Sequence, residues 1–240
     1  LAIGAMKPRD LPIKGREQEG VHFAMDFLKQ QNKLIRGDEF TKQERISAKG
    51  KNVVVIGGGD TGSDCVGTSI RQKAKSVLQI ELLPKPPEER KETNPWPYWP
   101  ETLRTSSSHL EGCERRWSLS SKEILGEDGS VKKLTITQIE WTKDEKGQFK
   151  MNEVPGTEET IDADLILLAM GFVHPVHEGL VNELGLELDG RGNIKTDAKG
   201  QTSNSKIFCS GDATSGASLV VRALDHGRKT AHAIHKYLGA

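Results

Sequence analysis

A glycine-rich stretch constrains the fold of this chain more than any other feature. The run Val53-Val54-Val55-Ile56 is apolar and of strand length, and glycines follow at the spacing G-x-G-x-x-G, at Gly57, Gly59 and Gly62. Residues 63–74 can then form a helix. In such a unit the first glycine permits a tight turn, the second lets the backbone approach a pyrophosphate, and the third lets the helix pack on the strand. The stretch predicts dinucleotide binding at the helix start; the alternative is a glycine-rich turn without a ligand.

The composition narrows the class of protein. The 240 residues contain 34 Lys and Arg and 34 Asp and Glu, so no net field attracts nucleic acid or an anionic membrane. No apolar run approaches the ~20 residues that span a bilayer. Cys65, Cys113 and Cys209 lie far apart without a C-x-x-C pair, which argues against a zinc site, a redox pair and a disulfide framework. We expect a reducing, cytoplasmic setting with no nucleic-acid or membrane partner. Because the chain begins at Leu1 without Met or a basic leader, we also expect a piece of a longer polypeptide.

The patterns outside the glycine stretch predict an α/β fold. Apolar runs favour strands at residues 76–83, 134–142, 148–154, 165–171 and 206–210, with 134–142 and 148–154 paired antiparallel. Helical periodicity is expected over 20–29 and most clearly over 218–238, where Gly239 follows the end. Residues 30–50 are expected to be a polar connector and residues 101–130 a loop.

The proline-rich segment 84–100 cannot form regular sheet or helix, because proline fixes φ and lacks a backbone donor. It also carries Trp96 and Trp99. Two interpretations remain open for it. The segment is either a rigid surface loop whose tryptophans pack on the domain, or a wall over the nicotinamide end of a bound nucleotide.

Two similar triplets suggest that one domain is inserted into another. Ala2-Ile3-Gly4 and Ala169-Met170-Gly171 each close an expected strand with a small residue and a glycine, and they bracket the complete βαβ unit. The chain would leave an outer domain after the first triplet and return to it after the second.

Several motifs together resemble the small (beta) subunit of bacterial glutamate synthase. They are Ala2-Ile3-Gly4-Ala5, Lys7-Pro8-Arg9-Asp10-Leu11-Pro12, Gly57-Gly58-Gly59-Asp60-Thr61-Gly62, Pro84-Lys85-Pro86-Pro87-Glu88-Glu89-Arg90, Asn94-Pro95-Trp96-Pro97 and Leu168-Ala169-Met170-Gly171-Phe172. The resemblance implies a flavoprotein in which an NADP(H) domain is inserted into a FAD domain. Electrons would pass from NADPH through FAD and iron–sulfur clusters to the large (alpha) subunit, and there drive formation of glutamate from glutamine and 2-oxoglutarate.

The resemblance also implies what this chain contains. The family's cysteine-rich iron–sulfur segment and its first FAD-binding glycine loop would lie before Leu1. The expected domains are 1–48 (end of a FAD-domain strand, loop, helix and connector), 49–165 (the NAD(P)H-binding domain) and 166–240 (the C-terminal part of the FAD domain). The fold class is therefore a Rossmann-like domain, with a central parallel sheet and an antiparallel excursion, inserted into a partial FAD-binding domain.

Site residues carry over from the family motif by motif. The pyrophosphate loop implies cofactor contacts at Gly57, Gly58, Gly59 and Gly62, with Asp60 and Thr61 at the helix start. Gly211 and Asp212 match the pair that meets the FAD ribityl and phosphate groups. Ser218 and Leu219, at the start of the last helix, would face the flavin pyrimidine edge. Ala169 and Gly171 of the second triplet complete this expected set.

The choice between NADP(H) and NAD(H) depends on the second strand. Glu81 matches the acid that binds a ribose 2′-hydroxyl in NAD sites, whereas Lys85 and Arg90 beyond it could reach a 2′-phosphate. The family favours NADP(H), and NAD(H) stays possible. Hydride transfer between cofactors needs no side-chain nucleophile, so we expect no catalytic acid or base.

Two alternatives to glutamate synthase stay open. One is another flavoprotein subunit, either of a ferredoxin-linked transhydrogenase or resembling dihydropyrimidine dehydrogenase. The other is a nucleotide-binding module without turnover. A thioredoxin reductase is disfavoured because the dithiol is absent. We expect no metal site: the histidines at 174, 177, 226, 232 and 235 are interpreted as surface or packing residues.

Overall fold

The computed structural model describes residues 1–41, 43–98 and 100–239. The chain forms two compact units, one of Asp10–Met170 and one of Leu1–Arg9 together with Gly171–Ala240. We call them the sheet unit and the split unit. The chain passes between the two units after Arg9 and after Met170. The domain bounds expected from the sequence, and the cofactor of each domain, stay predictions.

The sheet unit is built on a five-stranded parallel sheet. Its strand order is β1-β9-β2-β3-β4, with β1 at Val21–Phe23, β2 at Asn52–Ile56, β3 at Ser76–Ile80, β4 at Glu114–Arg116 and β9 at Leu165–Leu168. The helices are α1 at Ala24–Arg36, α2 at Asp60–Arg71 and α3 at Ser107–Leu110. A second, antiparallel sheet contains β5 at Leu119–Glu127, β6 at Ser130–Lys143, β7 at Phe149–Glu153 and β8 at Glu159–Asp162.

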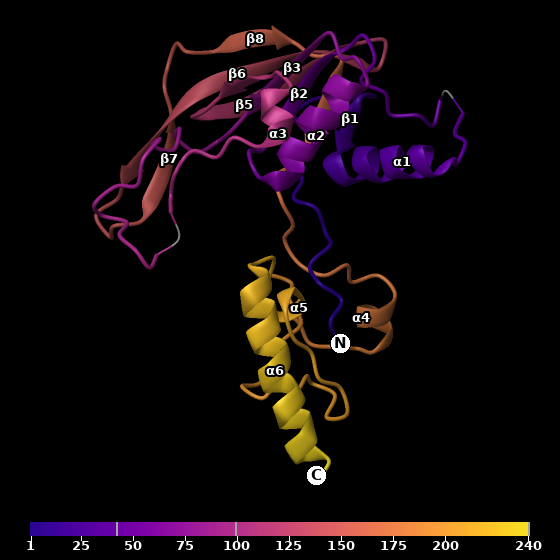
Figure 1. The fold of residues 1–240 in the computed structure, drawn as a ribbon, viewed down its shortest axis with the longest axis vertical. Helices are drawn as coiled ribbons and strands as arrows, with labels where there is room; N and C mark the ends of the chain where they lie inside the picture. The colour runs from indigo at the N-terminus through magenta and orange to yellow at the C-terminus, as the bar shows by residue number, and fades with distance from the viewer. Residues whose placement is uncertain (42, 99, 240) are drawn as a thin grey trace. The chain divides into compact units, whose positions relative to one another are not determined.

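The parallel sheet is the middle of three layers. Val53 and Val55 of β2 pack with α1 and α2, whereas Val54 and Ile56 pack with apolar residues of the antiparallel sheet. Figure 1 shows α1 and α2 together on one side of this sheet, opposite the antiparallel sheet. Because both faces are covered, β2 needs an unbroken apolar run, and this is why its sequence shows no polar alternation. The predicted parallel sheet and antiparallel excursion are both present.

Three local expectations were wrong. The helix expected over 20–29 begins as strand β1, because Val21 to Phe23 pair with β9, and it then continues to Arg36, where Gly37 ends it at a φ of 101°. The expected loop 101–130 contains α3, β4, β5 and the first residue of β6. The expected strand 206–210 forms only an isolated bridge, because its backbone bonds go to two separate segments, around Gly200 and at Leu1, instead of one continuous ladder.

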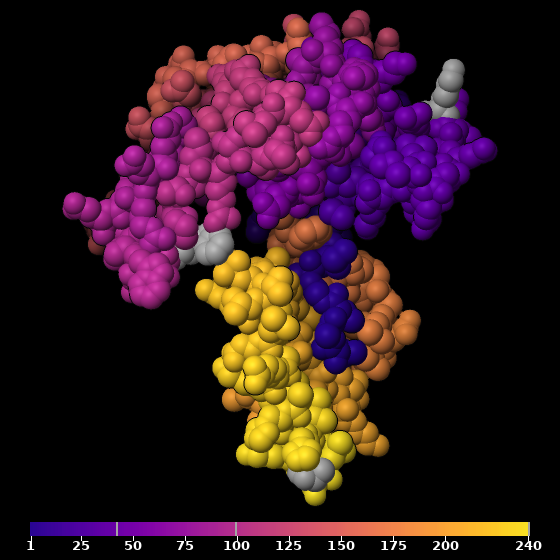
Figure 2. Space-filling model, viewed as in Figure 1, coloured from indigo at the N-terminus to yellow at the C-terminus, as the bar shows by residue number. Residues whose placement is uncertain are grey.

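The split unit has a small core and much irregular chain. Its helices are α4 at Leu180–Glu183, α5 at Asp212–Ser215 and α6 at Val220–Tyr237. Val181, Leu186, Ile194, Cys209 and Ala213 form the core. The helix expected over 218–238 is confirmed as α6, but its apolar residues are largely exposed, with Val220 75% and Leu224 63% exposed. In Figure 2 this helix lies on the surface of the split unit, in yellow.

The two chain segments that join the split unit to the sheet unit pair with each other. Arg9 N–H donates to the Gly171 carbonyl, Lys7 N–H donates to His174, and Val173 N–H returns a bond to Lys7, each at 2.9 Å. Pro8 and Phe172 form an antiparallel bridge between them. The segments that bear the two triplets are therefore held together as a short two-stranded ribbon.

No helix in the described part of the chain has both the length and the hydropathy to cross a membrane.

Candidate functional site

The glycine loop lies at the carboxyl end of β2, and each glycine of the motif occupies a different environment. Gly57 has a φ of 118°, and a Cβ added there would lie 2.3 Å from the Ala169 carbonyl oxygen. A Cβ at Gly62 would lie 2.2 Å from the Gly57 carbonyl oxygen, so only glycine lets α2 pack this closely. A Cβ at Gly59 would meet nothing within 4 Å. The first and third glycines thus serve packing, and the second leaves backbone open for a ligand.

The start of α2 faces the open side of this loop. Gly59 precedes the helix without a side-chain cap, and its carbonyl accepts the N–H of Ser63 at 3.0 Å. The first turn of a helix carries N–H groups without helical acceptors, which suit a phosphate. Asp60 is exposed and Thr61 is half-buried. Because the Asp60 carboxylate would repel a phosphate, its backbone N–H is the suitable group.

A cavity of about 400 Å³ opens beside the loop. The loop and α2 supply one wall, and the proline-rich segment and α3 supply the others; the lining residues are Gly58, Gly59, Asp60, Ser63, Pro86, Pro100, Glu101, Thr102, Arg104, Ser106 and His109. The proline-rich segment therefore forms part of a cavity wall. Trp96 is 83% exposed and does not pack on the domain. Trp99 lies outside the described residues.

Glu81 lies next to the loop, as its spacing predicts. A Cβ at Gly58 would fall within about 2 Å of the Glu81 carboxylate, so the two residues are in direct contact. Arg115 of β4 lies on the other side of the carboxylate, with Nη2 3.6 Å from Oε1, and both side chains are mostly buried. The Arg115 guanidinium also stacks over Trp117, 5.0 Å from the ring centre. The acid is therefore paired with a cation at the place where the adenosine ribose of a dinucleotide would lie.

Lys85 and Arg90 are not brought to this cavity. Both are exposed. Lys85 pairs with Glu88 at 3.5 Å and lies 5.7 Å over the Trp117 ring. Neither lines the cavity beside the loop. Of the nearby cations, Arg104 lines the cavity, and Arg115 lies beside Glu81. The sequence analysis missed both arginines because they lie in the segment that was expected to be a loop.

A second expected site lies within the split unit. A cavity of about 580 Å³ is lined by Gly211, Asp212 and Ser218, with Ala2, Gly4, Ser210, Val220, Ala223, Leu224, Gly227, Arg228 and Ala231. The Ser218 hydroxyl donates to Asp212 Oδ1 at 3.2 Å, and the Gly211 N–H donates to His226 Nδ1 at 3.1 Å. Leu219 is exposed directly before α6. The predicted residues Gly211, Asp212, Ser218 and Leu219 are thus near one another, at the start of a long helix. An exposed apolar wall, a carboxylate and free helix N–H groups fit one side of a flavin site.

Ala169 and Gly171 have different surroundings. The Ala169 carbonyl lies under Gly57 in the sheet unit. Gly171 has a φ of 80° and accepts the N–H of Arg9 in the split unit. Both therefore have defined structural roles, and their contact with a cofactor stays a prediction.

His174, His177 and Cys65 have defined surroundings. His174 and His177 stack with ring centres 4.2 Å apart, and their nitrogens face the carbonyls of Pro175 and Gly192. Within residues 1–41, 43–98 and 100–239, no group of three or more His, Cys, Asp or Glu could hold a metal ion. Burial raises the pKa of the Cys65 thiol to about 12. The three separate cysteines therefore do not fit an iron–sulfur cluster, which needs several thiolates at one place.

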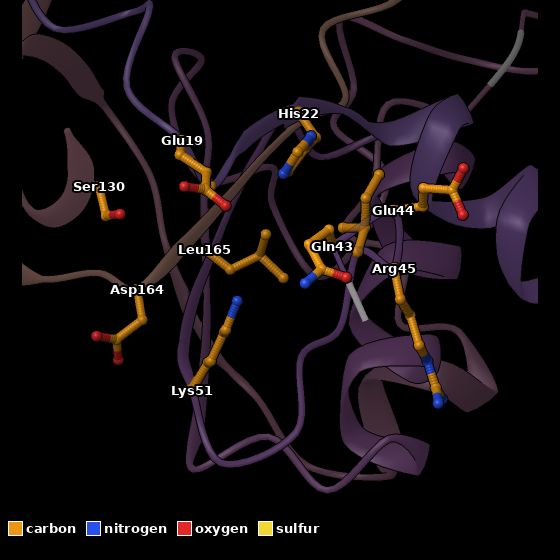
Figure 3. A pocket seen from close by; sticks show the side chains of 11 residues that line it. Glu19, His22, Gln43, Glu44, Arg45, Lys51, Ser130, Asp164 and Leu165 are labelled. Carbon is orange, nitrogen blue, oxygen red and sulfur yellow. The ribbon is translucent and has the colours of Figure 1, made fainter. Parts of the chain in front are cut away.

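Another cavity, of about 220 Å³, lies at the opposite edge of the parallel sheet (Figure 3). Gly20, Lys51 and Asp164, which directly precede β1, β2 and β9, line it. The side chains of His22 and Lys51 point into it in Figure 3. Ligands of parallel sheets bind beyond the carboxyl ends of the strands, so this amino-edge cavity is not the dinucleotide site.

Three features define the fold as that of the two-dinucleotide-binding oxidoreductases. They are the glycine loop at the carboxyl end of a parallel sheet, the antiparallel sheet that follows β4, and the second unit formed from both chain ends. The structure superposes on Mycobacterium tuberculosis FprA in complex with NADPH with a TM-score of 0.70, at 17% identity, over 99% of this chain and 63% of that one. For a thioredoxin reductase of T. acidophilum the TM-score is 0.60 at 21% identity, over 100% of this chain and 65% of that one. At these identities the likeness shows the fold. Residues 1–227 match the family model described as pyridine nucleotide-disulphide oxidoreductase, and the chain belongs to that family.

Relatives with higher sequence identity identify the protein family more narrowly. The chain is 44% identical to the glutamate synthase [NADPH] small chain of Mycobacterium tuberculosis, over 99% of this chain and 48% of the relative. It is 33% identical to the glutamate synthase [NADPH] small chain of Escherichia coli, over 99% of this chain and 50% of the relative. It is 45% identical to glutamate synthase [NADH] of Schizosaccharomyces pombe, over 98% and 11%. The chain thus spans about half the length of the bacterial relatives. The predicted resemblance to the glutamate synthase small subunit is confirmed.

Proposed function

We propose that this chain is the electron-input portion of a glutamate synthase small subunit, where NADPH is oxidised. The observation that carries the proposal is the glycine loop, in which Gly57 and Gly62 are forced by packing while Gly59 is left open beside the start of α2. The end-to-end similarity to glutamate synthase small chains supports the identity of the reaction.

The residues of the sheet unit would hold the nucleotide. The Gly59 backbone and the first-turn N–H groups of α2 would hold the pyrophosphate, and Glu81 with Arg115 would meet the adenosine ribose. The proline-rich wall would limit access of water. We propose NADP(H) ahead of NAD(H), because Arg115 neutralises Glu81 and offers a cation for a 2′-phosphate. Relatives named for NADH and for NADPH match about equally, so this choice depends on these two residues.

The split unit would contribute to a FAD site. Asp212 would accept hydrogen bonds from the flavin ribityl chain, and the N–H groups at Ser218 and Leu219 would face a region of developing negative charge. If these residues hold FAD, the chemistry that the cofactor would supply is acceptance of a hydride and release of the electrons one at a time. We further propose a large (alpha) subunit as the partner that receives the electrons, with iron–sulfur clusters carried outside these residues in a cytoplasmic enzyme.

Calorimetric titration with NADPH and with NADH tests the core of this proposal. Micromolar binding of NADPH, weakened in the Gly59→Ala variant, is expected. If the protein binds neither NADPH nor NADH, the proposed function is wrong. A visible spectrum tests the flavin part, because a yellow protein holds oxidised flavin whereas a colourless one that does not take up added FAD contradicts it.

A further inference from the structure

A chain of hydrogen bonds, buried at its centre between Gln79 and His109, connects the glycine loop to α3 and to the first turn of α2. Gln79, fully buried on β3, donates from Nε2 to the Gly57 carbonyl at 3.0 Å. Its Oε1 lies 2.9 Å from Nε2 of His109, a buried residue of α3. His109 Nδ1 lies 3.1 Å from the backbone N of Ser106. The Ser106 hydroxyl in turn pairs with the hydroxyl of Ser63 in the first turn of α2.

The directions of these bonds follow from the chemistry of each group. A carbonyl only accepts, so the Gln79 amide nitrogen must face Gly57, and its oxygen is left to face His109. An amide oxygen only accepts, so His109 Nε2 must carry a proton. The Ser106 backbone N–H only donates, so His109 Nδ1 must be bare. The imidazole is therefore the neutral Nε2–H tautomer. Burial, and secondarily Arg115, lowers the pKa of His109, which agrees with this state.

This chain reaches both sides of the place where a pyrophosphate would bind. At one end it holds the carbonyl of Gly57, the atom against which Gly62 packs. At the other end it holds Ser63, four residues after the glycine that is left open. Ser63, Ser106 and His109 all line the cavity beside the loop. Sequence reasoning did not find His109, because its segment reads as a serine-rich loop.

We propose that His109 is a positioning residue for the dinucleotide loop, which it orients through Gln79 on one side and through Ser106 and Ser63 on the other. This inference rests on the proposed function of the loop. Without the Nε2–H donor, the buried Gln79 Oε1 has lost its hydrogen-bond partner, and the Gln79 amide is no longer held from both ends in the orientation that donates to the Gly57 carbonyl. The loop then loses the single geometry in which Gly59 and the start of α2 face the same phosphate group.

Two conservative variants separate this role from simple packing. In His109→Gln the side-chain nitrogen occupies the place of Nε2 and keeps the donor to Gln79. In His109→Asn the side-chain oxygen occupies the place of Nδ1 and accepts from Ser106, but no donor reaches Gln79. Their dissociation constants for NADPH are measured by calorimetry at pH 7.5, with thermal unfolding in parallel. His22→Asn, a change at a half-buried histidine beside the cavity at the amino ends of the strands, is the control.

The expected result is a Kd within about threefold of the wild type for His109→Gln and His22→Asn, and at least about tenfold weaker for His109→Asn. Equal binding by His109→Gln and His109→Asn, with the wild type binding well, overturns the role of His109 alone. Absence of binding by the wild type overturns the proposed function as well. If His109→Asn does not fold, Ser106→Ala decides: it keeps the backbone N–H that donates to His109 Nδ1, and it removes the hydroxyl with its link to Ser63 and its two contacts with His109. Its Kd should rise at least about threefold, and an unchanged Kd overturns the proposal.

Discussion

Replacing Gly62 by alanine should disrupt both the packing of α2 and nucleotide binding. The new Cβ would lie 2.2 Å from the Gly57 carbonyl oxygen, against an ordinary contact of at least 3.4 Å, so one group must move by about 1.2 Å. It would also lie 2.8 Å from Gln79 Nε2, so turning the Gly57 carbonyl away breaks its bond to Gln79. Overpacking costs about 1–3 kcal/mol and the lost hydrogen bond about 1 kcal/mol, while alanine regains about 1 kcal/mol of helix propensity.

The net loss of about 1–3 kcal/mol should lower the Tm by roughly 2–4 °C per kcal/mol in a unit of this size. The matched control is Gly59→Ala, where the added Cβ meets open space and φ is −78°. That variant should unfold within about 2 °C of the wild type. It should nevertheless bind NADPH at least about tenfold more weakly, because its methyl group occupies the ligand's approach. Differential scanning calorimetry and titration with NADPH measure both quantities. The reasoning is refuted if Gly62→Ala is as stable as the wild type, or if Gly59→Ala binds normally.

Three further predictions concern charge and reactivity. Glu81→Gln should raise the preference for NADPH over NADH at least about fivefold in the ratio of Kd values, because it removes an anion from the expected 2′-phosphate position; an unchanged ratio would contradict the placement of the ribose. Burial lowers the pKa of His22 and of His109 below the ordinary histidine value of 6.5, so the folded state binds fewer protons than the unfolded state. Their contribution to stability should be complete above pH 6.5 and fall as the pH drops below it, and urea unfolding at pH 8, 6.5 and 5 should show this decrease. Iodoacetamide at pH 8 should modify Cys113, which is half-buried, well before Cys65, whose pKa is about 12; equal labelling of the folded protein would argue against a closed core around Cys65.

The sequence predicted those parts of the fold in which local pattern and burial agree. The β2–loop–α2 unit was found because a strand buried on both faces needs four apolar residues, and because each glycine has a packing or ligand-access reason. Helix α6 was found from its periodicity, although its apolar residues are exposed in the described chain. Periodicity reports which faces a helix can bury and not whether a partner covers them.

The parts that were missed are defined by tertiary pairing. Strand β4 is Glu114-Arg115-Arg116, a charged triplet that is a strand only because β3 pairs with it. The start of α3 is a capping box in which His109 takes the place usually held by glutamate or glutamine, so the usual signature is absent. Arg115, which pairs with Glu81, and His109, which contacts Gln79, both lie in this missed region. The spacing from the glycine motif predicted Glu81 but not Arg115, the cation that pairs with it.

The ribbon formed by residues 7–9 and 171–174 affects how the sheet unit is joined to the rest of the chain. Because Arg9 and Gly171 are hydrogen-bonded, the ends of Asp10–Met170 emerge side by side. For the split unit, the whole sheet unit is therefore a loop whose ends already meet. The entropy of closing such a loop grows only with the logarithm of its length, so a domain of any size could occupy this position at nearly the same cost. Residues 10–170 are accordingly the natural piece to excise, to express alone or to exchange for the equivalent piece of a relative.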